Sequence, residues 1–281
     1  MQGKTVVITG GTSGIGQVAG EALAKMGARI VLVARSKSRG EAALSRLQAI
    51  GPGRKHDVHY GDLSRLTEMR RVAKEIAAAE TRVDVLINNA GAMFDKRQVT
   101  EDGLELTFAT NHLSYFVMTH LLSERLITSA PSRVINTSSN AHYRGTMDFD
   151  NLEYEHDYKA FPAYSRSKLC NVLFTRVLAR RLNGTGVTAN SLHPGFVKTR
   201  FGDESGGRTA FAIRLMKMLF AISLEKGAET IIYLASSNEA SKSNGLYFYQ
   251  CKPVEPSKLA QDDAVADRLW QLTGKIAGIP D

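Results

Sequence analysis

The first 34 residues alternate between short apolar runs and a glycine-rich turn. Residues 4–9 and 29–34 each hold at least three consecutive apolar residues, as buried strands do. Between them, glycines at 10–16 open a helical pattern that runs to about residue 25, and Gly27 suits its C-terminal cap. Strand, helix and strand in this order form a right-handed βαβ unit, which predicts a parallel sheet covered by helices.

The alternation continues through the rest of the chain. Further strands are expected at residues 57–60, 83–87, 133–137, 187–192 and 246–249. Helical spacing occurs at residues 38–50, 66–79, 104–126, 163–182, 208–224, 226–235 and 262–272. No linker, repeat or low-complexity stretch divides the chain. We therefore predict one doubly wound α/β domain of the Rossmann type over residues 1–281, with a mostly parallel sheet.

Composition narrows the functional classes. The two cysteines do not make a disulfide framework, which favours a reducing, cytoplasmic location. No signal peptide and no run of about 18 uncharged apolar residues is visible, so no transmembrane anchor is expected. The net charge is +8, but the basic residues are scattered, and no nucleic-acid partner is expected. No histidine or cysteine cluster has metal-ligand spacing, so no metal is expected.

The first glycine loop has the setting of a dinucleotide-binding loop, since it follows a strand and opens a helix. Small residues let the backbone approach a pyrophosphate, and the helix N-terminus offers unpaired N–H groups to it. A turn that merely needs glycine is the alternative. The cofactor-binding residues expected in this loop are Gly10, Thr12, Ser13, Gly14, Ile15 and Gly16.

The residue at the end of the second strand is expected to lie near the adenosine ribose and to distinguish NADP(H) from NAD(H). It is Arg35, whose side chain can pair bidentately with a 2′-phosphate, so NADP(H) is favoured over NAD(H). An ordinary solvated arginine is the alternative. Asp62 is expected to accept from the adenine amino group with Leu63 beneath the ring, although an isolated helix-capping aspartate would suit position 62 equally well.

The ends of three later strands complete the expected cofactor site. Small residues after the fourth strand let the sheet edge approach the cofactor, and Asn89 can fix that turn. Backbone amides after the sixth strand, with the Thr199 hydroxyl, are expected near the nicotinamide carboxamide. These cofactor-binding residues are Asn89, Ala90, Gly91, Thr137, Pro194, Gly195, Val197 and Thr199.

Tyr164 and Lys168 are four residues apart and share one face of the helix expected at 163–182. An ammonium beside a phenol lowers the pKa of the phenol from about 10, which suits a proton donor and acceptor near neutral pH. Ser139, after the strand at 133–137, can hydrogen-bond the same substrate oxygen. Asn111 lies among apolar residues and needs partners, which a helix bulge, a water or an ordinary core contact would supply.

Taken together, these motifs resemble the short-chain dehydrogenase/reductase family. The resemblance implies a seven-stranded Rossmann-type sheet and hydride transfer between nicotinamide C4 and a carbinol or carbonyl carbon. Tyr164 would be the general acid/base, and Ser139 would position the substrate oxygen. Lys168 would hold the nicotinamide ribose, and Asn111 would anchor a proton-relay water. Tyr164 and Lys168 thus belong to both the catalytic and the cofactor-binding sets.

Other segments are similar to the retinol-dehydrogenase-like branch of that family, among them residues 138–142, 148–155, 227–230 and 269–270. This resemblance implies a hydrophobic alcohol, aldehyde or ketone as substrate. It also makes a homo-oligomer possible, through the helices that carry Asn111 and Tyr164. A substrate lid is expected around residues 200–224, where the helical pattern at 208–224 also suits core packing or a membrane-surface contact. A light-dependent protochlorophyllide-reductase-like enzyme and a non-catalytic NADP(H)-sensing protein are the alternatives.

Overall fold

The computed structural model describes residues 1–51, 53–196 and 222–279. Its centre is an eight-stranded sheet in the order β3-β2-β1-β4-β5-β6-β7-β8. The strands are β1 Thr5–Thr9, β2 Arg29–Ala34, β3 Asp57–Tyr60, β4 Val85–Asn88, β5 Ser132–Thr137, β6 Val187–Leu192, β7 Tyr247–Tyr249 and β8 Lys252–Pro253. Neighbouring strands run parallel from β3 to β7, which confirms the doubly wound α/β prediction.

The sheet has one strand more than the seven expected. β8 pairs antiparallel with β7, with Tyr249 opposite Lys252 and Phe248 opposite Pro253. Both residues of β8 are exposed. A strand of two exposed residues leaves no apolar alternation in the sequence, so pattern analysis could not find it.

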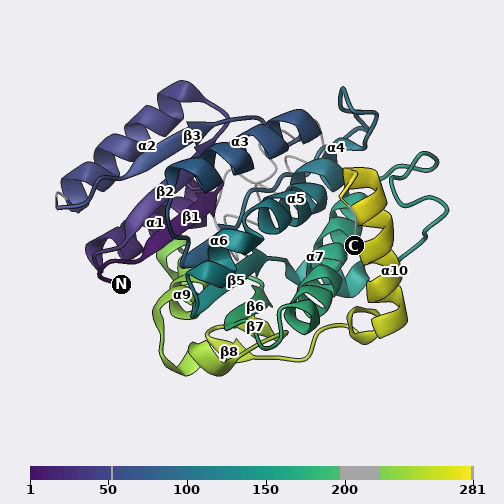
Figure 1. Cartoon of the computed structure of the whole chain (residues 1–281). Helices are drawn as coiled ribbons and strands as arrows, with labels where there is room; N and C mark the ends of the chain where they lie inside the picture. The colour runs from purple at the N-terminus through teal and green to yellow at the C-terminus, as the bar shows by residue number, and fades with distance from the viewer. Residues whose placement is uncertain (52, 197–221, 280–281) are drawn as a thin grey trace.

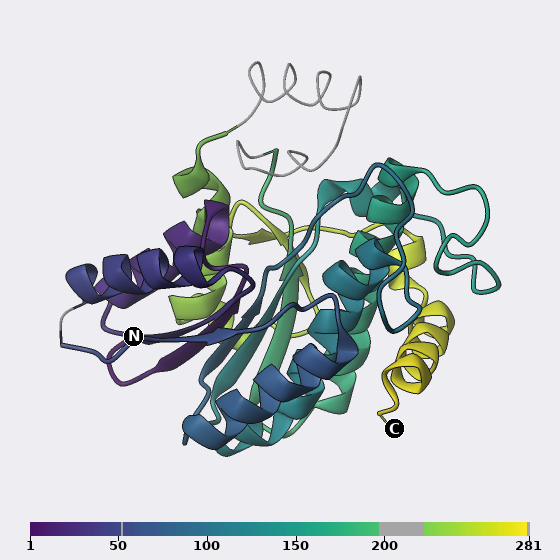
Figure 2. The same cartoon turned by 90° about the horizontal axis from the view of Figure 1, so that it is seen from above.

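Helices cover both faces of the sheet (Figures 1 and 2). One face carries α1, α2 and α9, and the other carries α3, α5 and α7. The C-terminal helix α10 lies outside α7, away from the sheet. The helices are α1 Gly14–Lys25, α2 Lys37–Ile50, α3 Leu66–Ala79, α4 Leu106–Phe108, α5 Ser114–Leu121, α6 Ser123–Thr128, α7 Ala160–Arg181, α9 Leu224–Ser236 and α10 Asp263–Ala277.

The two layers arise from strands buried on both faces. All five residues of β1 are buried, and successive side chains point to opposite sides. Val6 and Ile8 join the core beneath α1 and α9, while Val7 joins the core beneath α3 and α7. A parallel sheet with helices on both faces requires such continuous apolar runs.

The segment expected to be mostly helical over residues 104–126 is helical but broken. It divides into α4, a π-helical turn at Ala109–Leu113, α5 and α6. Apolar periodicity reports which face is buried and is blind to the extra residue of a π turn. The π turn lies beside α7 and carries Asn111.

Among residues 1–51, 53–196 and 222–279, no helix combines the length and apolar character needed to span a bilayer. The lid expected around residues 200–224 falls almost wholly on 197–221, outside the described residues.

Candidate active site

The residues singled out from the sequence meet at one edge of the sheet. The glycine loop follows β1, Asn89 follows β4, and Ser139 follows β5. Because these strands are parallel, their carboxyl ends share an edge, and the strand order reverses between β1 and β4. Open α/β sheets bind their ligands at such a switch point.

Tyr164 and Lys168 occupy the first turns of α7 and are both buried. The Ser139 hydroxyl shares a side-chain hydrogen bond with the Tyr164 phenol. The Lys168 ammonium lies 5.7 Å from the centre of the Tyr164 ring. It donates to the main-chain carbonyl of Thr137 at 3.1 Å. The serine, tyrosine and lysine therefore form one cluster.

Burial governs the acidity of this cluster. It raises the pKa of Tyr164 to about 12, and the hydrogen bond with Ser139 only partly opposes that shift. Burial also lowers the pKa of Lys168 to about 7. From the sequence, Lys168 was expected to lower the pKa of Tyr164, and for the protein alone this prediction is wrong in sign. It counted the neighbouring charge and left out desolvation, which acts on both groups.

The carbonyl of Thr137, at the end of β5, accepts from three buried side chains. Besides Lys168, the Tyr115 hydroxyl donates to it at 3.4 Å and the Asn171 amide donates at 3.4 Å. Nearby, the Ser138 hydroxyl donates to the Lys168 carbonyl at 2.7 Å, which fastens the end of β5 to α7. Lys168 is thus held against the strand end.

Asn111 makes the partners that a buried asparagine requires. Its side-chain oxygen accepts from the Ala92 amide at 2.8 Å, and its amide donates to the Ala92 carbonyl and the Ser167 hydroxyl, each at 2.9 Å. Its own main-chain carbonyl accepts from the Asn171 amide at 2.9 Å. The bulge proposed from the sequence is present as the π turn.

Asn89 joins the glycine loop to the neighbouring strand ends. Its amide donates to the Gly10 carbonyl at 3.2 Å, and its side-chain oxygen accepts from the Thr137 hydroxyl at 3.3 Å. The Thr9 hydroxyl accepts from the main-chain N–H groups of Asn89 and Ala90 at 2.9 and 3.1 Å. Gly10 has a φ of +67°, and a Cβ there would lie 2.8 Å from the Ala90 backbone. The loop therefore needs glycine at position 10.

The α1 terminus fits the phosphates of a dinucleotide. Ser13 stands at the N-cap, yet its side chain makes no capping hydrogen bond. The first-turn N–H groups are therefore not used by that side chain, which is the arrangement a bound phosphate needs. Gly14 has a φ of +61°, Ile15 is buried against the sheet, and Thr12 is half-buried at the loop.

The expected adenosine residues lie after β2 and β3. Arg35 is exposed beyond β2. The Asp62 carboxylate accepts from the amide and hydroxyl of Ser64 at 3.0 and 2.8 Å, so it organises the turn before α3. Leu63 is 8% exposed and packs into the core beneath α3.

The remaining expected cofactor contacts are only partly described. Gly91 lies so close to the centre that a Cβ there would be 3.2 Å from both the Asn111 side-chain oxygen and the Lys168 ammonium. Pro194 and Gly195 follow β6, as expected. Val197 and Thr199 lie outside the described residues.

Several residues of this site were not predicted from the sequence. Tyr115 and Asn171 contact the Thr137 carbonyl, and His112 contacts Asn171. Arg166 donates to carbonyls of the 146–152 loop and lies 3.8 Å over the Tyr154 ring, which fixes the long segment between Ser139 and Tyr164. The usable signal was a run of polar residues on α7 that the packing buries, namely Ser165, Arg166, Ser167, Lys168 and Asn171.

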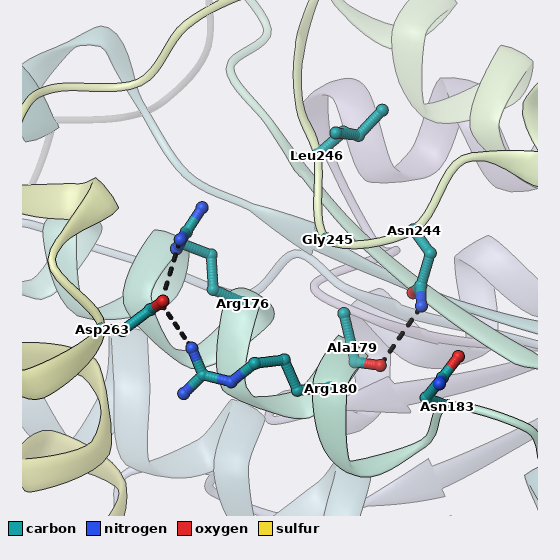
Figure 3. Close-up of a pocket in the computed structure, with 8 residues that line it drawn as sticks. All are labelled: Arg176, Ala179, Arg180, Asn183, Asn244, Gly245, Leu246 and Asp263. Atoms are coloured by element: carbon teal, nitrogen blue, oxygen red, sulfur yellow. Dashed lines mark hydrogen bonds and ion pairs between the residues drawn. The ribbon is translucent and has the colours of Figure 1, made fainter.

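A surface pocket of about 450 Å³ lies elsewhere (Figure 3). It is lined by the C-terminal part of α7 and by residues 244–246, which precede β7. Arg176 and Arg180 both pair with Asp263 there. Its walls include neither Tyr164 nor any other residue of the cluster, so it is separate from the candidate active site.

The comparisons with known proteins agree with this geometry. The model of the short chain dehydrogenase family matches residues 4–208. The chain belongs to the short-chain dehydrogenase family. Human retinol dehydrogenase 13 is 40% identical over 99% of this chain and 85% of its own length, and mouse retinol dehydrogenase 14 is 41% identical over 99% and 87%. The prediction of a retinol-dehydrogenase-like member of this family is therefore confirmed.

Solved structures of similar fold extend the comparison. An uncharacterized protein from Mycobacterium paratuberculosis has a TM-score of 0.79 and 32% identity, covering 99% of this chain and 94% of that one. The NADP complex of Pseudomonas aeruginosa RhlG has a TM-score of 0.71 and 27% identity, covering 88% and 94%. As a short-chain dehydrogenase, the protein is an oxidoreductase that uses a nicotinamide cofactor and a small-molecule substrate.

Proposed function

We propose that this short-chain dehydrogenase transfers a hydride between NADP(H) and the carbinol or carbonyl carbon of a hydrophobic alcohol, aldehyde or ketone. The observation that carries the proposal is the hydrogen bond between half-buried Ser139 and buried Tyr164, with buried Lys168 beside the Tyr164 ring. The bound cofactor supplies the hydride or accepts it. The protein residues bind, orient and handle the proton.

Tyr164 is the general acid/base in this proposal. Its pKa of about 12 keeps the phenol protonated at neutral pH, so it is ready to donate a proton to a carbonyl oxygen. Ser139 hydrogen-bonds the same oxygen and orients it. Lys168 would bind the nicotinamide ribose beside Tyr164. Asn111 would anchor a water that relays the proton. Oxidation of an alcohol runs the same proton transfer in reverse.

Several residues support the choice of cofactor. Gly10 through Gly16 would hold the pyrophosphate at the N-terminus of α1, and Arg35 would bind the 2′-phosphate of NADP(H). Asp62 and Leu63 would lie beside the adenine. The path to the nicotinamide would be lined by Asn89, Ala90, Gly91 and Thr137. Pro194 and Gly195 would contact the carboxamide end, together with Val197 and Thr199, which lie outside the described residues. The NADP found with RhlG is consistent with this assignment.

Exposed aromatic residues support a hydrophobic substrate. Phe161 is 46% exposed and lies one turn before Tyr164 on α7. Phe196 is 40% exposed just after β6, and Tyr143 is 46% exposed after β5. Exposed rings on the first turn of α7 and after the ends of β5 and β6 suit an apolar carbon chain better than a charged substrate. A lid from residues 200–224 would complete this surface.

A substrate screen tests the proposal. Retinaldehyde, aliphatic aldehydes, aromatic ketones and steroids are offered in the dark, and consumption of NADPH is followed by absorbance. We expect turnover of at least one apolar carbonyl, and Tyr164→Phe should lower kcat/KM by about 10²–10⁴-fold. Tyr233→Phe, which removes a hydroxyl on α9, is the matched control.

The outcomes separate the rival functions. Full turnover by the Tyr164→Phe protein would contradict the role of Tyr164 as general acid/base. Turnover only under illumination would favour a light-dependent reductase, and tight NADPH binding without turnover of any compound would favour a cofactor-sensing protein.

A further inference from the structure

A buried chain of hydrogen bonds joins the C-terminal helix to the reaction centre. The Thr273 hydroxyl on α10 lies 3.1 Å from Nε2 of His112, and Nδ1 of His112 lies 3.3 Å from the side-chain oxygen of Asn171. The Asn171 amide then donates to the carbonyls of Asn111 and Thr137. Thr273, His112 and Asn171 are each at most 1% exposed.

The chemistry of the partners fixes the direction of every bond in this chain. The two main-chain carbonyls can only accept, so the NH₂ of Asn171 must face them and its oxygen must face His112. His112 therefore carries its proton on Nδ1, and its Nε2 accepts from the Thr273 hydroxyl. Burial lowers the pKa of His112 to about 4, so the ring is neutral and has one donor and one acceptor.

The chain ends on the carbonyl that holds Lys168. Asn171 lies three residues after Lys168 on α7, and both side chains donate to the Thr137 carbonyl. The same Asn171 amide holds the carbonyl of Asn111 in the π turn. A change in the Asn171 amide would therefore move the acceptor of Lys168 and the Asn111 backbone together.

We propose that Asn171, His112 and Thr273 are positioning residues of this enzyme, which hold the Thr137 and Asn111 carbonyls in register with Lys168 and tie that register to α10. None of the three contacts Tyr164 or Ser139 in the hydrogen bonds described above. The kinetic part of this inference rests on the proposed function, and the structural part stands without it.

The first test is independent of activity. In protein labelled with ¹⁵N-histidine, His112 is assigned by the loss of its signals in His112→Gln, and its tautomer is read from the two ring nitrogens. We expect the Nδ1–H tautomer at pH 7, and Thr273→Val should shift the Nε2 resonance because that nitrogen loses its donor. An Nε2–H tautomer would overturn the inference, since it reverses the chain.

The second test is kinetic and uses near-isosteric variants. Asn171→Leu should lower kcat by about ten- to hundredfold, because misplacing a catalytic group by about 1 Å has effects of this size. Thr273→Val should lower kcat by less, and both should shift the pH profile of kcat. The double variant should lose no more than Asn171→Leu alone, because the two residues act through one chain.

Leu269→Val is the matched control, since it trims the same buried face of α10 and removes no donor or acceptor of the hydrogen-bond chain. It should leave the pH profile unchanged, and its effect should add to that of Asn171→Leu. If Thr273→Val behaves like Leu269→Val, or if the Asn171 and Thr273 effects add, the inference fails while wild-type turnover still supports the proposed function. Absence of wild-type turnover, with the expected tautomer, would reject the proposed function alone.

Discussion

At the scale of single residues, burial sets the protonation states on which the proposed mechanism depends. It raises the pKa of Tyr164 to about 12 and lowers the pKa of Lys168 to about 7. The phenol is thus an acid at neutral pH, while Lys168 changes charge close to neutrality. In the proposed mechanism, carbonyl reduction uses the protonated Tyr164 phenol and alcohol oxidation uses the phenolate.

We expect the two directions to differ in their pH dependence. Carbonyl reduction uses the protonated phenol, which persists to about pH 12, so its kcat/KM should not rise with pH. Alcohol oxidation needs the phenolate, whose fraction grows about tenfold per pH unit below the pKa, so its kcat/KM should rise steadily. Initial rates in both directions from pH 6 to 10 at constant ionic strength measure this. Oxidation that stays flat while reduction falls would contradict it.

Arg35 allows a separate prediction about the cofactor. Arg35→Asp should weaken NADPH binding by about ten- to hundredfold, since hydrogen bonds between charged groups contribute about 1.5–3 kcal/mol. NADH binding should change little. Fluorescence titration of both cofactors measures the ratio, with Arg54→Asp beyond the far end of α2 as the charge-matched control. Equal losses for both cofactors would reject the NADP(H) assignment.

At the scale of elements, strong local periodicity was a good guide. The helix at Leu66–Ala79 and the strand at Val187–Leu192 have the bounds expected from the sequence. Their apolar faces are regular, and nothing distant interrupts them. Periodicity gave no sign of the π turn at Ala109–Leu113, and only the buried Asn111 suggested a bulge there. The bounds of the turn were out of reach, because the partner of its Asn111 carbonyl is Asn171, far along the chain.

The residues of the candidate site likewise fall into those that the sequence could identify and those that it could not. Tyr164, Lys168, Ser139 and Asn89 carry recognisable motifs, and they gather at one sheet edge. Residues such as His112 and Thr273 have no local signature, because their roles depend on contacts between remote helices. The predicted fall in the pKa of Tyr164 was wrong for a related reason. The sequence shows that Lys168 is a neighbour but does not show how deeply both side chains are buried.

The packing of α10 on α7 gives a prediction about stability. The Trp270 ring stacks on Phe174 with centroids 5.7 Å apart and meets Phe116 edge-on at 5.0 Å. Arg181 lies 4.7 Å over the same ring. Trp270→Ala should lower the free energy of unfolding by about 3–5 kcal/mol, because it opens a cavity between α10 and α7.

Urea denaturation followed by circular dichroism measures this loss. Trp270→Phe keeps much of the ring contact and should lose clearly less. Equal losses in the two variants would show that ring stacking contributes little to the attachment of α10.

At the scale of the whole molecule, α10 bears on self-association. The family resemblance seen in the sequence made a homo-oligomer possible through the helices that carry Asn111 and Tyr164. In this chain α10 packs along α7 and also touches α5, so part of that surface is already covered (Figure 1). A dimer through the same face would have to displace a helix anchored by Trp270.

We therefore expect a monomer at micromolar concentrations, because the helix that would need to move buries a large aromatic side chain. Sedimentation equilibrium gives the mass directly. Trp270→Ala, which loosens α10, should be the variant most prone to pair, and Leu269→Val provides the comparison. A stable wild-type dimer that persists on dilution would show that another face is used.

The short antiparallel strand β8 has a consequence for colloidal behaviour. A sheet margin with unpaired backbone groups invites a strand from another molecule to add to it. Here the outermost positions are Lys252 and Pro253, a charged residue and one that lacks an N–H donor. We therefore expect these two residues to protect this edge of the sheet against fibril growth, although they contribute almost nothing to the core.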